Sequence, residues 1–395
     1  MAFDWRGLLR FCRRALLETK DNNRRLTPRR LAWTLLAYAF YPPFELATWG
    51  GLGLDELFYP AYRKQEVREP IFIIGNPRSG TTFLHRLMTR DKRTFACMHT
   101  WEIFFAPSIV SRRVVKALSA LDGWLGNPFE KTMAGLEGRW QDRNVMHVQA
   151  MRAPDEDEAL LLHSFGSVLI WSFTSMLDDA RAFTFYDQRV PHAERMAQTA
   201  FYKRCLQRYL HSDGRHPEGA QRHYLSKNPA FTSRIDTLLE QFPDARFVYI
   251  ARNPLDMIPS MTSITRFVWT LVGDPVEYGS LHDYVIELAK HGYHYPLERL
   301  QGLDPGRYVV VRFDDLTGNA RQTVEGIYRQ FGLELSPGYA RILDEATERA
   351  RHHRSRHHYS LEALGLSRER ILSECADVFD RFGFDRREQG CDAET

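Results

Sequence analysis

The chain has 395 residues, of which 44% are hydrophobic and 26% charged, a composition typical of a folded protein rather than a disordered one. Its 53 basic and 50 acidic residues give a net charge of +3, which excludes the strong positive excess of a nucleic-acid-binding protein. The five cysteines are odd in number and include no C-x-x-C pair. They predict free thiols in the cytoplasm, with neither a disulfide framework nor a structural zinc site.

Residues 1–60 are predicted to form helices that precede the main domain. Basic residues recur too often in the first 30 positions for a secretory signal. The apolar stretch from Leu31 to Phe40 is interrupted by Pro42 and Pro43, well short of the roughly 20 residues that cross a bilayer. Because arginines precede this stretch and tryptophans accompany it, we predict that the segment either packs on the domain or makes peripheral contact with a membrane.

Short apolar runs rich in β-branched residues predict the buried strands of a parallel sheet in an α/β fold. These runs are residues 71–74, 247–250 and 308–311, with a weaker candidate at 224–226. No repeat or low-complexity linker divides the chain, so we expect residues 61–395 to form one domain with a helical insertion at about 110–215. Polar residues follow each strand, and ligands bind beyond the carboxyl ends of such strands. One crevice should therefore gather them.

The segment from Pro70 to Met88, PIFIIGNPRSGTTFLHRLM, predicts a strand, a glycine-containing turn and a helix. The backbone N–H groups of Gly80, Thr81 and Thr82 would open that helix, where the helix dipole favours a phosphate. The loop of nucleotide triphosphatases, G-x-x-x-x-G-K-[ST], has a lysine at the position of Thr81. The turn is therefore poorly suited to a triphosphate, and Arg78 supplies positive charge at a different point.

The run from Gly75 to Thr82, GNPRSGTT, resembles the 5′-phosphosulfate loop of sulfotransferases that use 3′-phosphoadenosine-5′-phosphosulfate (PAPS). The arginine in this P-[KR]-S-G-T-T motif makes it similar to bacterial and tyrosylprotein sulfotransferases. The resemblance implies a P-loop-type three-layer fold, a central parallel sheet with a mainly helical cap, and PAPS as co-substrate without a metal. It assigns the binding of the phosphosulfate to Arg78, Ser79, Gly80, Thr81 and Thr82.

Two further motifs support the same resemblance. Arg252 ends a predicted strand and Ser260 follows eight residues later in a helix, a guanidinium and a hydroxyl that together suit a phosphate dianion. This pair is similar to the family's 3′-phosphate motif. Lys227 matches the family's lysine that contacts the phosphosulfate. In the cytosolic branch a histidine base follows that lysine, but this chain has Asn228 and Pro229 there, so the base must come from elsewhere.

Glu102 is the predicted base, because tyrosylprotein and several polysaccharide sulfotransferases use a glutamate from the corresponding region. A glutamate acts as a base only when desolvation or hydrogen bonding tunes its pKa. His99, His147 and one member of the acidic run from Asp155 to Glu158 stay open as alternatives. We interpret the acidic run itself as a helix N-terminus, where carboxylates favour the dipole.

A basic segment with four histidines, residues 351–358, closes the domain. The histidines are not spaced as a helical pair with a third carboxylate ligand, so no metal site is predicted. Bacterial sulfotransferases carry a similar late segment. The resemblance implies that Arg354 or Arg356 helps to cover the bound donor.

Together the motifs predict a sulfotransferase in which Glu102 takes the acceptor proton while Lys227 and Arg78 stabilise the departing phosphate. The acceptor is expected to be a small molecule, lipid or glycan with a hydroxyl group. One alternative is a P-loop kinase or nucleotide-binding protein acting on ATP. Another is a non-catalytic, membrane-associated binding protein on the same fold.

Overall fold

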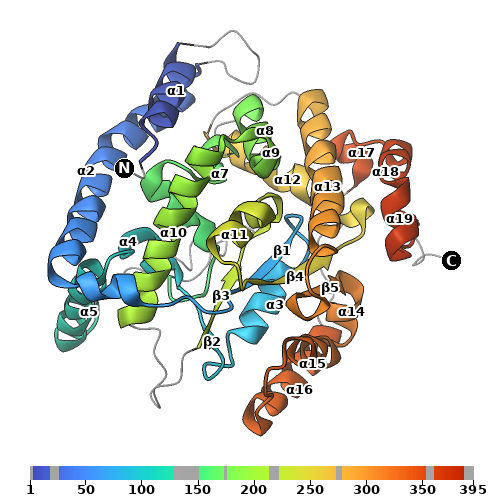
Figure 1. The fold of residues 1–395 in the computed structure, drawn as a ribbon. Helices are drawn as coiled ribbons and strands as arrows, with labels where there is room; N and C mark the ends of the chain where they lie inside the picture. The colour runs from blue at the N-terminus through green and yellow to red at the C-terminus, as the bar shows by residue number, and fades with distance from the viewer. Residues whose placement is uncertain are drawn as a thin grey trace.

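The fold is built around a parallel five-stranded sheet, seen at the centre of the computed structural model in Figure 1. The structure describes residues 3–17, 26–128, 131, 151–172, 176–212, 222–272, 278–352 and 360–386. The strand order is β2-β3-β1-β4-β5. The strands are β1 (Ile71–Gly75), β2 (Phe95–Ala96), β3 (His223–Lys227), β4 (Arg246–Ala251) and β5 (Tyr308–Arg312). The strands predicted from the apolar runs, including the weaker one, are confirmed.

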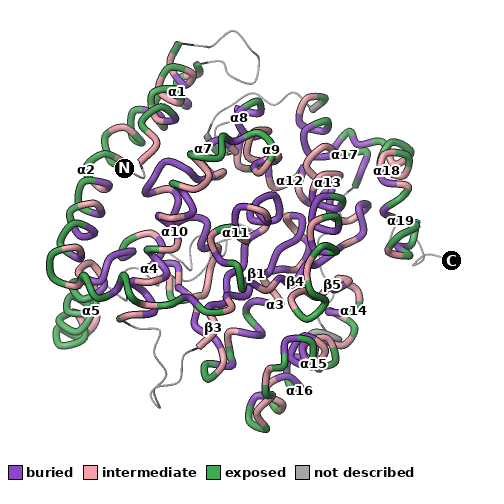
Figure 2. Tube along the Cα trace, in the orientation of Figure 1, coloured by how far each residue is buried: buried purple, intermediate pink, exposed green. Residues whose placement is uncertain are grey.

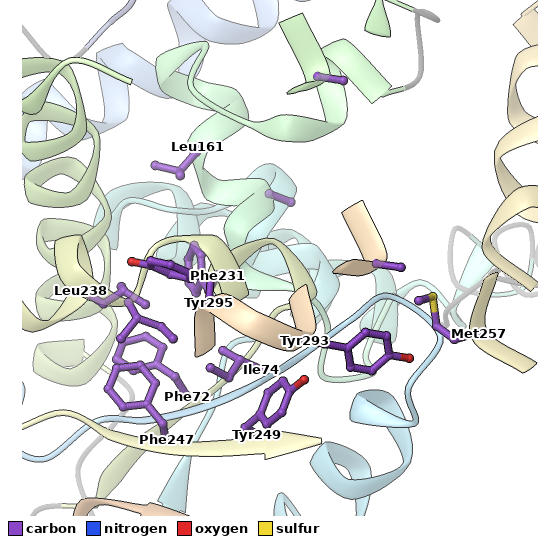
Figure 3. Packing of buried hydrophobic residues seen from close by; sticks show 14 of the residues in the cluster. Phe72, Ile74, Leu161, Phe231, Leu238, Phe247, Tyr249, Met257, Tyr293 and Tyr295 are labelled. Carbon is purple, nitrogen blue, oxygen red and sulfur yellow. The ribbon is translucent and has the colours of Figure 1, made fainter. Parts of the chain in front are cut away.

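The sheet separates two apolar cores, because successive side chains of each strand point to opposite faces. In β1, Ile71 and Ile73 enter one core while Phe72 and Ile74 enter the other. Figure 3 shows Phe72 beside Phe247 of β4, and their ring centroids lie 5.7 Å apart. The predicted three-layer α/β architecture, with helices on both faces of a parallel sheet, is therefore confirmed.

Helices cover both faces of the sheet and fill the segments between the strands (Figure 1). The core of Ile71 and Ile73 is covered by α3 (Thr81–Met88), α14 (Phe313–Gly318), α15 (Ala320–Phe331) and α16 (Pro337–His352). The other core is covered by α10 (His192–Ser212), α11 (Ile235–Gln241), α12 (Pro254–Val272), α13 (Tyr278–Leu300), α17 (Leu361–Leu364), α18 (Arg368–Glu374) and α19 (Ala376–Phe382).

The described parts of the predicted insertion are helical. They contain α5 (Ile109–Trp124), the 3-10 helix η3 (Asp157–Ser164), α7 (Val168–Ser172), α8 (Leu177–Thr184), α9 (Tyr186–Arg189) and α10. The remaining short elements are α4 (Thr100–Phe105), η2 (Pro60–Lys64), η4 (Pro229–Ser233) and η5 (Pro305–Arg307). The acidic run leads into η3, so its predicted place at a helix N-terminus is confirmed, although the helix is of the 3-10 type.

Two N-terminal helices, α1 (Trp5–Leu16) and α2 (Pro28–Phe58), lie along one edge of the molecule (Figure 1). The predicted interruption at Pro42 and Pro43 does not end the helix, since α2 runs through both prolines. Each proline removes a backbone donor from the helix. The helix is held from outside instead, because the Tyr41 hydroxyl donates to the Leu162 carbonyl at 2.7 Å. Within the described ranges, we find no helix with the length and apolarity needed to span a bilayer.

Candidate active site

The glycine-containing turn joins β1 to α3 with an unusual backbone. Gly80 caps α3 with φ of 87°, and a Cβ at this position would lie 2.5 Å from the Phe313 ring. A side chain is therefore disfavoured both by the left-handed backbone and by the lack of space. Arg78 also has a positive φ, 69°, which is uncommon for a residue with a side chain. Such backbone strain is typical of binding sites, and here it fixes the direction in which the Arg78 side chain leaves the turn.

Arg252 and Ser260 both contact this turn. The Arg78 Nε donates to the Ser260 hydroxyl at 2.9 Å, and an Arg252 Nη donates to the Arg78 carbonyl at 2.8 Å. The Arg252 guanidinium also stacks on the Phe313 ring, 4.3 Å from its centroid. β4 supplies the arginine and α12 the serine, so residues 174 and 182 positions from Arg78 in the sequence meet it in space. Two guanidinium groups and a hydroxyl therefore form one cluster of hydrogen-bond donors.

A carboxylate lies beside this cluster. The Asp256 carboxylate lies 3.8 Å from the Arg252 Nε. Burial lowers the pKa of Arg252 from its usual value, and Arg78 contributes in the same direction. The buried polar atoms that make no hydrogen bond within the described residues include the Arg252 Nε and the Ser79 hydroxyl. Buried donors are normally satisfied, so these atoms fit a site that binds an anionic ligand.

Lys227 approaches the same turn from β3. It is 0% exposed, and its Nζ lies 3.3 Å from the Thr82 hydroxyl and 2.9 Å from a carboxylate oxygen of Glu156. The loop lacks a lysine at Thr81, and this neighbouring strand brings one to the start of α3. A second positive group therefore lies at the other end of the run from Arg78 to Thr82.

Glu156 is a half-exposed member of the acidic run and pairs with Lys227. Asp155 is also half-exposed, but it accepts a hydrogen bond from the Thr100 hydroxyl. The Glu156 side chain is 39% exposed, whereas Asp157 and Glu158 are buried. Asp157 accepts hydrogen bonds from Tyr202 at 2.6 Å, and from Tyr224 and Ser226 at 3.0 and 2.7 Å.

Glu158 accepts from Arg234 and from the backbone N–H of Val168, both at 2.9 Å. With Asp157 it therefore fixes the start of η3. The ion pair to Lys227 then holds Glu156 at the site.

The carboxylate of Glu102, the predicted base, contacts His99. Glu102 lies in the first turn of α4, where its carboxylate accepts from the His99 backbone N–H at 2.8 Å and contacts the His99 Nδ1 at 2.9 Å. Its side chain is 5% exposed. This arrangement is a capping box, which stabilises the helix N-terminus. Across the described residues, Glu102 makes no hydrogen bond or ion pair to Lys227, Arg78 or Arg252. The geometry of the site favours Glu156 for contact with a reacting group.

The structure brings together most of the predicted site residues. Arg78, Ser79, Gly80, Thr81, Thr82, Lys227, Arg252 and Ser260 lie at or beside the one turn. Arg354, Arg356 and His147 fall outside the described residues. Across the described ranges, no three His, Cys, Asp or Glu side chains are grouped so that they could hold a metal ion.

Sequence reasoning did not single out Glu156 from its neighbours, nor Phe313 as the ring beneath Arg252. Four successive acidic residues were the available signal for Glu156. Only the partners of Asp157 and Glu158 show which carboxylate is left exposed.

Comparison with known proteins agrees with the motifs. The model of the sulfotransferase family matches residues 70–337, which include the turn, Lys227, Arg252 and Ser260. A curated relative is the omega-hydroxy-beta-dihydromenaquinone-9 sulfotransferase Stf3 of Mycobacterium bovis. It is 24% identical over 331 residues, which cover 80% of this chain and 76% of that protein.

Two solved structures have a similar fold. Sulfotransferase STF9 from Mycobacterium avium aligns with a TM-score of 0.66 and 18% identity, over 85% of this chain and 82% of that one. Sulfotransferase STF1 from Mycobacterium tuberculosis aligns with a TM-score of 0.60 and 23% identity, over 83% and 81%. The turn from Arg78 to Thr82 lies inside the matched region, and more than half of the chain matches the family model. The chain therefore belongs to the sulfotransferase family.

Proposed function

We propose that this enzyme transfers a sulfuryl group from PAPS to a hydroxyl group of an acceptor. The observation that best supports this proposal is that the turn from Arg78 to Thr82 has cations at both ends. Arg252 and Arg78 lie at one end with Ser260, and Lys227 lies at the other. A nucleotide with a 3′-phosphate and a 5′-phosphosulfate has two anionic groups to place. One stretch of five residues offers a site for each.

Arg252 and Ser260 would bind the 3′-phosphate, and Arg78, which donates to Ser260 in the structure, would contact the 5′-phosphosulfate. Guanidinium groups form charge-assisted hydrogen bonds to phosphate, and a hydroxyl can donate a further one. The amides of Gly80, Thr81 and Thr82 would bind the 5′-phosphosulfate at the positive end of α3. The Ser79 hydroxyl and the Arg252 Nε, which make no hydrogen bond among the described residues, support such a role, because a bound anion would satisfy both.

Glu156 is the proposed general base. PAPS supplies a sulfuryl group whose leaving group is a phosphate. Glu156 accepts the proton of the acceptor hydroxyl as the oxygen–sulfur bond forms and the bond from sulfur to the bridging oxygen breaks. The products are a sulfate ester and adenosine 3′,5′-bisphosphate. Lys227 donates toward the oxygen on which charge grows, since a preorganised donor there stabilises the transition state most.

We further propose an apolar acceptor, a lipid that carries a hydroxyl group. The name of the mycobacterial relative describes it as acting on a hydroxylated menaquinone derivative. That precedent favours a lipid over a glycan for this chain. The described cysteines are free thiols, which supports a reducing compartment such as the cytoplasm.

Calorimetry with adenosine 3′,5′-bisphosphate and with ATP tests the donor site. We expect the bisphosphate to bind and ATP to bind far more weakly, because the loop lacks the lysine that a triphosphate needs. Equal or tighter binding of ATP would favour the kinase alternative.

An acceptor screen with labelled PAPS then tests the reaction. Hydroxylated isoprenoids, sterols, oligosaccharides and a tyrosine peptide are compared by mass spectrometry for the mass gain of a sulfate ester. We expect the isoprenoid and sterol hydroxyls to react. Transfer to the peptide or oligosaccharide alone would contradict the lipid assignment. Bisphosphate binding without transfer to any acceptor would favour a non-catalytic binding protein.

A further inference from the structure

The helix α2 buries several polar side chains and exposes large apolar ones, which is the reverse of the usual pattern of a surface helix. Its buried positions include Arg30, Glu45 and Asp55. Its exposed large apolar side chains are Leu31, Trp33, Leu35, Leu36, Phe40, Leu46, Leu54, Leu57 and Phe58. A helix that packs on a soluble core normally shows the opposite pattern. Figure 2 shows the long exposed stretches of α2 at the edge of the molecule.

Hydrogen bonds attach α2 together with aromatic packing, in which Tyr41 contacts Phe165 and Trp49 contacts Phe201. Glu45 lies 3.0 Å from the His163 Nδ1, and the Trp49 indole donates to the His163 carbonyl at 2.9 Å. Asp55 accepts from the first two N–H groups of α5, those of Ile109 and Val110, at 2.8 and 3.0 Å. These polar anchors fix the rotation of the helix. They leave its apolar side chains pointing outward.

The outward face of α2 is uncharged over most of its length. Between Arg30 and Asp55 the sequence contains one charged residue, Glu45, which is buried. The 24 intervening residues span about 36 Å at 1.5 Å per residue. An uninterrupted apolar face of this length exceeds what soluble monomers usually expose to water.

α5 packs against α2 and extends the apolar face. Val114, Leu118, Leu121 and Leu125 recur at intervals of three and four residues along α5 and are exposed, as is Trp124 at 80%. Among the described residues, the exposed large apolar side chains outside α1, α2, α5 and their flanks are few. They are Phe105, Phe267, Leu271 and Val310.

Cations accompany this apolar face. α1 lies beside α2, with the rings of Phe11 and Tyr38 6.5 Å apart. One side of α1 carries four arginines and a leucine that together line a surface concavity, namely Arg6, Leu9, Arg10, Arg13 and Arg14. Arg29 is exposed at the start of α2. A helix pair with arginines beside exposed Trp, Phe and Leu side chains has the composition of a membrane-surface element.

We propose that the outer faces of α1, α2 and α5 dock in the plane of a bilayer that contains anionic phospholipids. The apolar side chains would enter the headgroup and acyl boundary while the exposed Arg6 and Arg29 contact lipid phosphates. Arg10 and Arg14 pair with Asp179 of the protein itself. A second copy of this chain fits less well. It would bring the same arginines, and the outer face of α2 offers no acidic side chain to pair with them. Docking does not require the sulfuryl transfer proposed above.

Sedimentation with vesicles of equal parts phosphatidylcholine and phosphatidylglycerol tests the docking surface. We expect the full chain to bind these vesicles, and to bind pure phosphatidylcholine vesicles more weakly. The double variant Phe40→Ser, Leu46→Ser should lower the partition coefficient about tenfold or more, because both side chains leave water on docking. They are 71% and 77% exposed in the structure, so the fold should be retained.

Two controls match this variant. Exchanging the residues, Phe40→Leu with Leu46→Phe, keeps the apolar face and should restore binding. Val310→Ser removes an exposed apolar side chain from β5 and should leave binding unchanged. Binding of bisphosphate nucleotide, measured on every variant, checks that the distant anion site is intact.

A charge variant gives an independent measurement. Arg6→Glu with Arg29→Glu should weaken binding to the anionic vesicles about tenfold, and raised salt should weaken wild-type binding. Arg329→Glu with Arg341→Glu, on the exposed sides of α15 and α16, should not. The proposal is overturned if the wild-type chain ignores anionic vesicles, or if it binds them equally well with Phe40 and Leu46 replaced. Concentration-dependent dimers that the serine variant abolishes would instead assign the face to a second copy.

Discussion

The two ends of η3 meet two different regions of the molecule. At its start, Asp157 and Glu158 are buried among hydrogen-bond donors while the adjoining Glu156 stays accessible beside Lys227. At its end, the carbonyls of Leu162 and His163 accept hydrogen bonds from α2, and an uncharged apolar helix face stays accessible. Both regions use buried polar groups for attachment. What each leaves exposed differs, a carboxylate in one and an apolar surface in the other, and that difference underlies the proposed chemistry at one end and the proposed docking at the other.

The largest expected effect separates Glu156 from the buried carboxylates. Glu156→Gln should reduce turnover by about 10²–10⁴-fold, the usual contribution of a general base, while nucleotide binding persists. Glu102→Gln is the matched control, since the amide oxygen can still accept from the His99 N–H. It should cost less than about tenfold, because the Glu102 carboxylate is held in the capping box of α4. Single-turnover transfer from labelled PAPS measures both. The reverse ranking would return the role of base to Glu102.

Lys227→Ala should reduce turnover by nearly as much as Glu156→Gln. Loss of one preorganised donor at a developing charge typically costs about 2.7–4 kcal/mol, or about 10²–10³ in turnover. Lys203, whose Nζ donates to the Gln241 carbonyl at 3.0 Å, is the control lysine. Its replacement by alanine should leave turnover close to normal. Near-normal turnover in Lys227→Ala would remove the role assigned to this residue.

The sequence predicted the strand, turn and helix from β1 to α3 more directly than the place of Glu156. Apolar runs and the glycine turn are local signals, and the covalent order of β1, turn and α3 already brings Gly80 to Thr82 to a helix N-terminus. The place of Glu156 depends on partners far away in the chain. Tyr202 and Tyr224 bind Asp157 across 45 and 67 residues. No local pattern contains that information.

The inverse pattern of α2 was also hidden from the sequence. The apolar run from Leu31 to Phe40 could equally face a core or a membrane. Only the contacts of Glu45 and Asp55 fix which side of the helix points outward. Pro42 and Pro43 were interpreted as an interruption, yet α2 continues through them because tertiary hydrogen bonds hold its flanks.

The affinity for nucleotide tests the roles of Arg252 and Ser260, which lie beside Arg78 in the turn. Arg252→Ala should weaken binding of adenosine 3′,5′-bisphosphate by about 10- to 100-fold, since it removes charge-assisted hydrogen bonds. Ser260→Ala should weaken it several-fold less. Adenosine 5′-phosphosulfate, which lacks the 3′-phosphate, is the control ligand, and neither variant should change its affinity much. Equal losses for both ligands would place Arg252 away from the 3′-phosphate.

The smallest expected effect concerns Asp157, whose hydrogen bonds hold the start of η3. Burial raises the pKa of Asp157 to about 6, against the lowering effect of its Tyr and Ser donors. The unfolded chain has an ordinary Asp pKa of about 3.9. Between these values the folded state holds a proton that the unfolded state has lost. The contribution of Asp157 to the free energy of unfolding therefore falls as pH rises, by about 1.5 kcal/mol from about pH 4.5 to about pH 6.

Asp157→Asn isolates this contribution, because asparagine does not titrate. Buried His85, whose pKa burial lowers to about 3, acts in the opposite direction, but it is present in both proteins and cancels in their difference. Urea denaturation across this pH range should show wild-type stability declining relative to the variant. A constant difference would mean that Asp157 stays ionised throughout. The start of η3 would then contain two ionised carboxylates, Asp157 and Glu158, of which Glu158 pairs with Arg234.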